Sequence, residues 1–334
     1  MSIWVKSKIT GTAILAILFT GLTFGQANAA EMGSMHIAFG DVPGADMLNF
    51  LAAAKRAEER GVKLQVSYLQ SEDIASQAIV SGQADIGVGT PYALIQKVKA
   101  PIRMFYQLSA LRFFPIINTE KYSSWKDLDG EPMYTHARGS GTEAIMNLMA
   151  TKNNIKYSSM SYVPGSAVRA GAMLQGRIFA TIVDSERRRL LLRKGGGRFA
   201  LLPLPEINAS DEALYANTDF LAENKEAINI LLEELIHVWR EVNKNPEVIL
   251  EYRAKYNLLP DMPDQDVADI VPYYSETVST GAFSSNGGGV AAVEGDFEFY
   301  GFAGTIKGDL SKLKVNDYWH LAPLDKALNK LGRM

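Results

Sequence analysis

A short run of small and polar residues, Arg138-Gly139-Ser140-Gly141-Thr142, has the composition of an anion-binding turn. It follows a predicted strand, Met133–Ala137, and precedes a predicted helix, Gly141–Asn153. The first turn of a helix leaves backbone N–H groups unpaired and carries partial positive charge, so a small anion can bind there. Ser140 or Thr142 can cap the helix, and an ordinary capped connection explains the same residues.

Two other strand-to-helix turns, Gly40–Asp46 and Gly89–Tyr92, have similar chemistry. In open α/β sheets, ligands bind beyond the carboxyl ends of the strands. A cleft between two lobes would therefore bring these turns face to face with Arg138–Thr142. Asp184 ends another predicted strand on the same side of the second lobe, and Phe113 lies near an expected crossover between lobes.

The elements that must position these turns form two successive α/β runs. The alternation predicts parallel sheets covered by helices on both faces. The first run contains strands at Met35–Gly40, Lys63–Leu69 and Ala84–Gly89, with helices at Met47–Arg60 and Glu72–Ser81, and leads to strands at Pro101–Leu108 and Phe113–Asn118. The second contains strands at Met133–Ala137, Met160–Val163, Phe179–Val183 and Phe199–Leu204, with helices at Gly141–Asn153, Ala167–Gln175 and Ser185–Arg193.

Beyond Asn208 the chain is predicted to be mostly helical. A helix at Asp264–Val278 is expected to be kinked or broken by Pro272, and Ser284–Gly289 is expected to be a flexible loop. An apolar stripe at helical spacing is expected to be core: Ile228, Leu231, Leu232, Leu235, Trp239 and Val242. The predicted organisation is a signal peptide at 1–29, a first lobe at 34–118, a second lobe at 119–212, and a return to the first lobe at 213–334.

The N-terminus has the pattern of a secretory signal peptide. Lys6 and Lys8 precede an apolar run, Ile9–Phe24, and small residues around Ala29 provide a cleavage site. The run is shorter than the ~20 residues that a membrane span needs, so we expect cleavage near Ala29 and release into a bacterial periplasm. A permanent N-terminal anchor is the alternative.

The composition excludes several kinds of site. The chain of 334 residues has no cysteine, which excludes disulfides, thiolate metal sites and a cysteine nucleophile. Its net charge of −3 and the lack of a basic stripe predict no nucleic-acid partner. Signatures of nucleotide-binding, hydrolase and zinc-dependent enzymes are missing. We therefore predict no cofactor, no metal and no catalytic residue, although His136 with Asp184 is a conceivable acid–base pair.

The sequence resembles the substrate-binding proteins of nitrate, sulfonate and taurine ABC importers, a family that also contains binding proteins for thiamin-pyrimidine precursors. The resemblance rests on Gln83–Thr90 (QADIGVGT), on Trp125–Gly130 (WKDLDG) with Gly139–Thr142 after it, and on Tyr318-Trp319 with Pro323-Leu324 near the end. It covers nearly the whole mature chain. A catalytic offshoot of the family, a pyrimidine synthase, uses a cysteine-rich motif that this chain lacks.

The resemblance implies an α/β fold of the periplasmic-binding-protein type II class, with two lobes joined by two crossover strands and a ligand cleft between them. It also implies a monomer that delivers a small molecule to an ABC permease of the inner membrane. Together with the turns described above, it gives these candidate ligand-binding residues: Asp41, Val42, Gly44, Ala45, Gly89, Thr90, Pro91, Tyr92, Phe113, Arg138, Ser140, Gly141, Thr142 and Asp184.

The expected ligand is a small organic anion or zwitterion, such as a sulfonate, a carboxylate or a heterocyclic acid. Arg138 and the helix N-termini favour an anion. The carboxylates near the expected cleft favour an amine or a neutral polar group: Asp41, Asp46, Glu143 and Asp184. Two other functions stay open: a ligand-sensing module for a membrane receptor, and a secreted enzyme on the same fold. The basic cluster around Arg187–Arg189 is expected to be a solvated helix face, with permease docking as the alternative.

Overall fold

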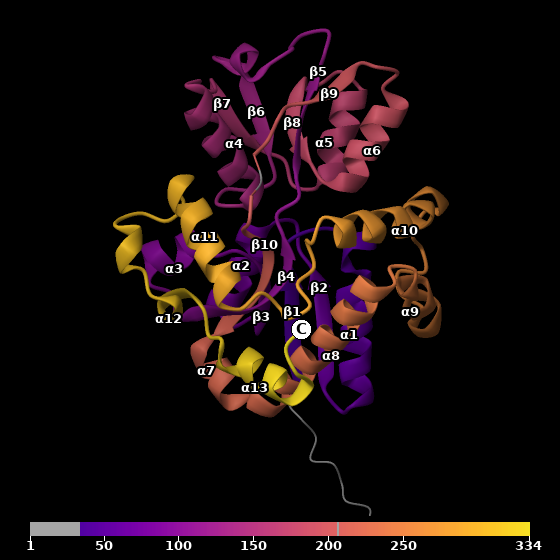
Figure 1. The fold of residues 1–334 in the computed structure, drawn as a ribbon, viewed down its shortest axis with the longest axis vertical. Helices are drawn as coiled ribbons and strands as arrows, with labels where there is room; N and C mark the ends of the chain where they lie inside the picture. Colours follow the sequence, from indigo (N-terminus) through magenta and orange to yellow (C-terminus); the bar gives the residue numbers. More distant parts are fainter. Residues whose placement is uncertain (1–33, 206) are drawn as a thin grey trace, which may run out of the picture. The chain divides into compact units, whose positions relative to one another are not determined.

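The computed structural model describes residues 34–205 and 207–334 (Figure 1). The predicted signal peptide lies outside these residues. Among the described residues, no helix has both the length and the apolar character that crossing a membrane requires.

The larger sheet has five strands in the order β2-β1-β3-β10-β4. They are β1 (Ser34–Phe39), β2 (Lys63–Tyr68), β3 (Ile86–Gly89), β4 (Ile102–Ala110) and β10 (Ser210–Asn217). β1 pairs in parallel with both β2 and β3, which confirms the parallel arrangement predicted for the first run. β10 is antiparallel to both of its neighbours, so the sheet is mixed.

A second group of strands lies between β4 and β10 in the sequence. β5 (Phe114–Asn118) pairs antiparallel with β8 (Ala180–Val183) and β9 (Phe199–Leu201). β6 (Pro132–Thr135) pairs in parallel with β7 (Ser159–Tyr162). β5 is thus hydrogen-bonded to strands of the segment predicted as lobe two, although it falls within the range predicted for lobe one. The lobe limits themselves stay a prediction.

The helices follow the alternation predicted from the sequence over most of the chain. The first part contains η1 (Ala45–Met47), α1 (Leu48–Glu59), α2 (Glu72–Val80) and α3 (Tyr92–Val98), followed by η2 (Trp125–Leu128), α4 (Gly141–Asn153), α5 (Ser166–Leu174) and α6 (Ser185–Lys194). The last part contains α7 (Thr218–Glu223), α8 (Lys225–Lys244), α9 (Val248–Tyr256), α10 (Asp264–Ser279), α11 (Val290–Phe302), η3 (Leu310–Lys312), α12 (Val315–Tyr318) and α13 (Ala322–Leu331).

The apolar stripe predicted on α8 is part of the main core. Its six residues are at most 1% exposed, and α8 packs against α1 and α13. The core also contains Phe39 and Phe105 from the five-stranded sheet. Burying side chains of this size contributes about 1.5–3 kcal/mol each, so α8 and α1 fix one face of the sheet that carries half of the site described below.

The C-terminal part differs from the prediction in three places. β10 is a strand in a region predicted to be mostly helical, and α11 was not predicted. α10 continues through Pro272 as one helix, so it is not broken there. The glycine loop Ser284–Gly289 packs on β4: the Gln107 N–H donates to the Gly287 carbonyl at 3.0 Å.

The two connections between the larger sheet and β5, β8 and β9 run beside each other. The Leu111 N–H, after β4, donates to the carbonyl of Ala209, before β10, at 2.8 Å. The Arg112 guanidinium donates to the carbonyls of Leu111, Ile207 and Thr280, which ties both connections to the end of α10. This is the pair of crossovers that the sequence resemblance implies.

Candidate functional site

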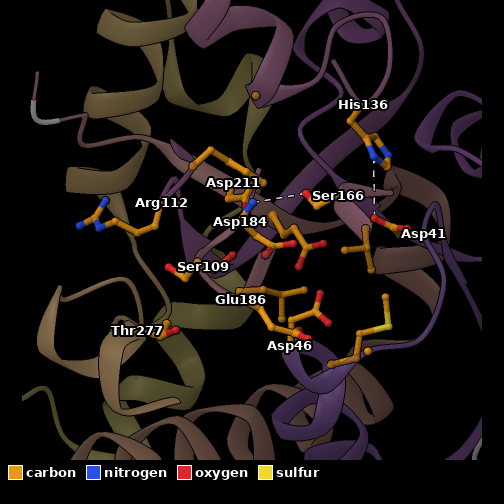
Figure 2. A pocket seen from close by; sticks show the side chains of 18 of the residues that line it. Asp41, Asp46, Ser109, Arg112, His136, Ser166, Asp184, Glu186, Asp211 and Thr277 are labelled. Carbon is orange, nitrogen blue, oxygen red and sulfur yellow. Dashed lines mark hydrogen bonds and ion pairs between the residues drawn. The ribbon is translucent and has the colours of Figure 1, made fainter. Parts of the chain in front are cut away.

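A cavity of 160 Å³ opens where the carboxyl ends of β1 and β3 and the start of β10 meet the N-termini of α4, α5 and α6 (Figure 2). An apolar cavity of about 150 Å³ is large enough for benzene, so this one suits a small molecule. Its walls include six aromatic side chains: Phe39, Phe50, Phe113, Trp239, Tyr273 and Phe283.

Carboxylates dominate the polar lining of this pocket. Figure 2 shows several of them, from separate segments of the chain, gathered around its centre. Asp41 follows β1, Asp46 lies in η1, and Glu72 starts α2. The complete set is Asp41, Asp46, Glu72, Asp184, Glu186, Asp211 and Glu212.

A bulge in β10 explains how two adjacent carboxylates enter the same pocket. Consecutive side chains of a regular strand point to opposite faces. Here Ser210 pairs with Ala110 and Glu212 with Ser109, so Asp211 is an extra residue in the ladder. A bulge of this kind redirects side chains, and both Asp211 and Glu212 line the pocket.

A close backbone contact at Gly40 brings Glu72 to the pocket. A Cβ atom at Gly40 would lie 2.4 Å from the Glu72 nitrogen and 2.5 Å from its Cα, so only glycine allows α2 to start this near the end of β1. Ser71 caps α2 by accepting the N–H of Ile74. The first turn of α2 therefore sits beside Asp41 and turns the Glu72 carboxylate toward the same space.

Burial, and after it the neighbouring carboxylates, raises the pKa values of several of these carboxyl groups. Burial, the largest cause, and the neighbouring Asp41 raise the pKa of Glu72 to about 8. Burial and then Glu72 raise the pKa of Glu212 to about 8. The pKa of Asp211 is also raised well above the ordinary value, first by burial and then by Glu212. Asp46 is an exposed residue that lines the open side of the pocket.

Three of these carboxylates have no polar partner among the described residues. The side chains of Asp46, Asp211 and Glu212 form no hydrogen bond and no ion pair there. Asp211 and Glu212 are half-buried, and carboxylates that lose contact with water are usually paired or hydrogen-bonded. The cluster is therefore a site with unused capacity to bind positive charge or hydrogen-bond donors.

His136 adds an unpartnered nitrogen to the same wall. Its side chain is buried, and its Nδ1 accepts the Gly165 N–H at 3.2 Å, which places the ring hydrogen on Nε2. Nε2 has no hydrogen-bond partner, and its nearest carboxylate is Glu72 Oε1 at 3.8 Å. Burial lowers the pKa of His136, against the opposing effect of Asp41. The neutral ring therefore keeps one buried N–H donor without a partner in the pocket wall.

The arginines of the lining already donate to protein oxygens. Arg169 donates to the carbonyls of Ile182 and Val163 and to Ser166 Oγ. Arg187 pairs with Glu186. Arg112 lies away from the carboxylates in Figure 2 and donates to backbone carbonyls. Arg187 offsets Glu186, so these guanidinium groups neutralise only part of the charge of the seven carboxylates.

Eight of the fourteen candidate residues line the pocket. Most of them lie at the ends of strands or at helix N-termini, as the sequence predicts. They are Asp41, Val42, Gly44, Phe113, Ser140, Gly141, Thr142 and Asp184. Their role in binding stays a prediction.

The other six candidates do not line the pocket: Ala45, Gly89, Thr90, Pro91, Tyr92 and Arg138. Tyr92 instead donates to the buried Asp296 carboxylate at 2.5 Å and accepts from Trp319. Thr90 hydrogen-bonds to Tyr300, which donates to the Ser210 carbonyl. The turn after β3 is thus part of a hydrogen-bond network that holds the start of β10 in place. It affects the pocket only indirectly, because β10 carries Asp211 and Glu212.

Part of the anion-binding capacity expected just before α4 is taken by the chain's own carboxylate. Glu143 accepts the Gly139 N–H at 2.5 Å and the Tyr162 hydroxyl, and Ser140 caps the helix by accepting the Glu143 N–H. Arg138 is exposed and stacks over the Tyr162 ring at 5.3 Å. This turn therefore has less free capacity for an external anion than its sequence suggests.

Sequence reasoning did not select Glu72, Glu186, Asp211 or Glu212 as ligand contacts. Glu72 and Glu186 occupy first-turn helix positions, where acidic residues are common for purely local reasons. Asp46 and His136 had been noticed near the site but not selected. The available signal was that Asp46, Glu72 and Glu186 each begin a helix that follows a strand, at the edge where ligands bind.

The basic cluster on α6 bonds to α10. Glu276 accepts from Ser185 at 3.0 Å, from Arg188 at 2.6 Å and from Arg189 at 2.5 Å. Arg193 lies 3.7 Å from Asp269. The expectation of a solvated face is therefore wrong for Arg188 and Arg189, because α10 supplies partners that the local sequence does not reveal.

No group of three or more histidine, aspartate or glutamate side chains in residues 34–205 and 207–334 is arranged to hold a metal ion. The carboxylates and His136 are thus spread around a cavity and do not converge on one point.

Comparison with known proteins gives the family. A family model described as NMT1/THI5 like matches residues 48–249. The chain belongs to this NMT1/THI5-like family. No curated protein sequence matches it. The family and the structural likenesses below agree with the resemblance found in the sequence.

Solved structures similar to this NMT1/THI5-like protein give its fold. A protein of Bordetella bronchiseptica RB50 has a TM-score of 0.72 at 18% identity, over 90% of this chain and 98% of that one. The ligand-binding component of an ABC-type import system from Staphylococcus aureus, with zinc bound, has a TM-score of 0.68 at 12% identity, over 89% and 99%. The alkanesulfonate-binding protein of Xanthomonas axonopodis pv. citri, bound to MOPS, has a TM-score of 0.58 at 14% identity, over 73% and 85%. The predicted periplasmic-binding-protein fold is confirmed.

Proposed function

We propose that this protein is the solute-binding component of an ABC importer. The observation that carries the proposal is the pocket, whose walls come from both groups of strands. Asp41, Glu72 and Glu212 enter from the five-stranded sheet and its helices, while His136 and Asp184 enter from the segment between β5 and β9. A ligand that contacts both walls favours the closed arrangement over an open one.

The paired connections support a hinge between the two walls. They meet at the hydrogen bond from Leu111 to Ala209, and no other strand crosses between the sheets among the described residues. Closure brings α6 onto α10, where Glu276 accepts bonds from Arg188 and Arg189. In this proposal the first lobe contains residues 34–118 and 213–334, and the second contains residues 119–212, with β5 and β10 at their boundary.

The proposed setting is the periplasm. Export would use the N-terminal signal peptide with cleavage near Ala29, and a monomer would then deliver its ligand to an ABC permease of the inner membrane. Two structurally similar proteins, an import-system component and an alkanesulfonate-binding protein, support this setting. A ligand-sensing role would use the same pocket and closure, with a membrane receptor as the partner.

Of the predicted ligand classes, a zwitterion suits the pocket better than a simple anion. A sulfonate or nitrate would lie close to Asp184, Asp211 and Glu212, and like charges brought together out of water cost several kcal/mol, by order of magnitude. A zwitterion can direct its ammonium group at these side chains.

The proposed role of His136 is to bind the ligand and not to catalyse a reaction. Its Nδ1 accepts a backbone N–H and its Nε2 has no partner, so it activates no serine or threonine hydroxyl. A nucleophilic mechanism needs such a pair within hydrogen-bond reach. The acid–base pair with Asp184 that the sequence suggests is not formed among the described contacts.

The test is to isolate the protein from the periplasm and identify small molecules released on denaturation by mass spectrometry. We expect a released compound, added back to stripped protein, to raise its melting temperature through linkage. Turnover of that compound, abolished by His136→Gln, would contradict the receptor role. So would an extract in which no compound changes the melting temperature.

A further inference from the structure

We propose that the pocket selects an organic cation that carries one hydrogen-bond acceptor: an ammonium, amidinium or protonated nitrogen heterocycle held by Asp46, Asp211 and Glu212, with its acceptor on His136 Nε2. This inference rests on the proposed receptor function and specifies its ligand class. It departs from the anion and the zwitterion, because it assigns the ligand no negative end.

The first reason is the set of carboxylates without partners. Asp211 and Glu212 project from the β10 bulge into one cavity, and Asp46 faces them from η1. None of the three bonds to another group among the described residues. A cation with several N–H donors can satisfy all of them through charge-assisted hydrogen bonds, which are about twice as strong as neutral ones.

The second reason is independent of charge. His136 is 7% exposed, lines the cavity, and has a buried Nε2 with no hydrogen-bond partner. The bond from Gly165 to Nδ1 makes Nε2 the donor. Buried polar atoms without partners are rare, so the ligand should present an acceptor here, such as a hydroxyl, a carbonyl or an unprotonated ring nitrogen.

The third reason is that several of the positive groups around the cavity, although not the uncapped N-terminus of α5, already have anionic or carbonyl partners. Glu143 accepts the Gly139 N–H just before α4, and Asp184 caps α6 by accepting the Arg187 N–H. Arg169 donates to carbonyls, and Arg187 pairs with Glu186. A ligand carboxylate or sulfonate that binds at these groups would have to displace an internal partner.

The aromatic side chains fit the same ligand. Phe39 and Phe50 meet edge to face at 5.0 Å between ring centroids, and Trp239 and Phe283 meet at 5.7 Å. Rings of this kind bind a flat apolar body by contact and attract a cation through their π faces. The expected ligand therefore has a small apolar or heteroaromatic body between its cationic group and its acceptor.

Three probes with the same ring and different charge test the inference: 3-(aminomethyl)pyridine, nicotinamide and nicotinate. Each has a ring nitrogen that can accept from His136, while the net charge changes from positive through neutral to negative near neutral pH. We expect the amine to raise the melting temperature most and nicotinate least. A larger shift with nicotinate, or no shift with any probe, overturns the cation assignment.

Two pocket variants and one matched control locate the effect. Asp211→Asn and Glu212→Gln should weaken binding of 3-(aminomethyl)pyridine by about tenfold or more, because each removes a carboxyl group that a bound cation would hold in its ionised form. Glu251→Gln, on an exposed face of α9 away from the pocket, should leave it unchanged. Binding that is undiminished in both pocket variants overturns the inference, provided that each variant melts no lower than the wild type.

The compound released from periplasmic protein separates the two proposals. If that compound is an anion and stabilises the stripped protein, the receptor function stands and the cation assignment fails. If neither the three probes nor any extracted compound stabilises the protein, the receptor function fails as well.

Discussion

Two acidic regions of this molecule differ in one respect: whether a cation stands beside each carboxylate. On α8, Glu234 accepts from Arg56 at 2.6 Å and from Arg60 at 2.7 Å, and Glu233 accepts from Lys330 at 2.8 Å. Burial alone would raise the pKa of Glu234, but the hydrogen bonds from Arg56 and Arg60 outweigh it and lower the pKa.

In the pocket the same residue type has the opposite shift. Glu212 is surrounded by carboxylates instead of arginines, and burial followed by Glu72 and Asp41 raises its pKa to about 8. The paired carboxylates between α1 and α8 therefore stabilise the fold. The pocket carboxylates lack such partners, so a bound ligand can stabilise their ionised form. Perturbed titration in a cleft is typical of a functional site.

The largest expected effect comes from breaking the paired region. Arg56→Met should lower the free energy of unfolding by about 2 kcal/mol, since it removes one of the two guanidinium groups that bond to the buried Glu234. Urea unfolding measures the change. Lys55→Met, which removes an exposed pair with Glu58, is the matched control and should change stability by under about 1 kcal/mol. Equal losses in both variants would show that pairing is not what stabilises this region.

The pocket should respond in the opposite direction. Glu212→Gln removes the cost of keeping this carboxyl group protonated in the folded protein and should raise the free energy of unfolding of the ligand-free protein by about 1 kcal/mol or more. The same variant should bind ligand more weakly. Urea unfolding of stripped protein checks the first effect, and a destabilised Glu212→Gln would mean that the carboxylate has a structural partner.

The two regions should also differ in their dependence on pH. The pKa of Glu212 is about 8 in the folded protein and near 4.5 when unfolded, so the folded state binds more protons between these values. Stability from this group is therefore full below about pH 4.5 and is lost as the pH rises toward 8. Glu72, whose pKa is also raised to about 8, adds to the same slope.

Glu234 has the reverse behaviour, because its pKa is lowered: its contribution is present above 4.5 and is lost as the pH falls below it. Melting temperatures of stripped protein from about pH 5 to about pH 8.5 should fall in the wild type, and fall less steeply in Glu212→Gln. Identical slopes for the two proteins would refute the role of this carboxylate.

The smallest expected effect concerns Glu276, a paired carboxylate that joins α6 to α10. Glu276→Gln weakens the bonds from Arg188 and Arg189, which are partly exposed and screened by solvent. We expect a two- to fivefold loss of ligand affinity, by order of magnitude, with little change in unfolding. Calorimetry at low and high salt measures the ligand affinity. An affinity that changes with neither the substitution nor the salt concentration would mean that the contact between Glu276 and α6 plays no part in closure.

Much of the fold can be predicted because its signals are local. The glycines after α1 and α2 end helices, and the stripe from Ile228 to Val242 identifies the buried face of α8. β10 was missed because Ser210-Asp211-Glu212 has the composition of a helix start. α11 was missed because it contains Gly295, and glycine is typical of loops. The glycine is needed for packing, since a Cβ atom at this position would lie 1.9 Å from the Asn208 carbonyl oxygen.

The candidate site was predictable in position but not in charge. Strand ends and capped helices located Asp41, Thr142 and Asp184 at the pocket. Glu72 and Glu186 look like ordinary first-turn acids, and only the tertiary arrangement brings them together with Glu212. Arg138 looks like an anion ligand until Tyr162 and the internal bond from Gly139 to Glu143 are seen.

The bond from Gly139 to Glu143 has a consequence for selectivity in the proposed periplasmic setting. Dissolved inorganic anions compete for unpaired N–H groups near helix N-termini. Glu143 is tethered to the same helix, so its effective concentration at the Gly139 N–H exceeds that of any dissolved ion by the logic of intramolecular binding. In the proposed receptor, this N–H is therefore closed to common inorganic anions.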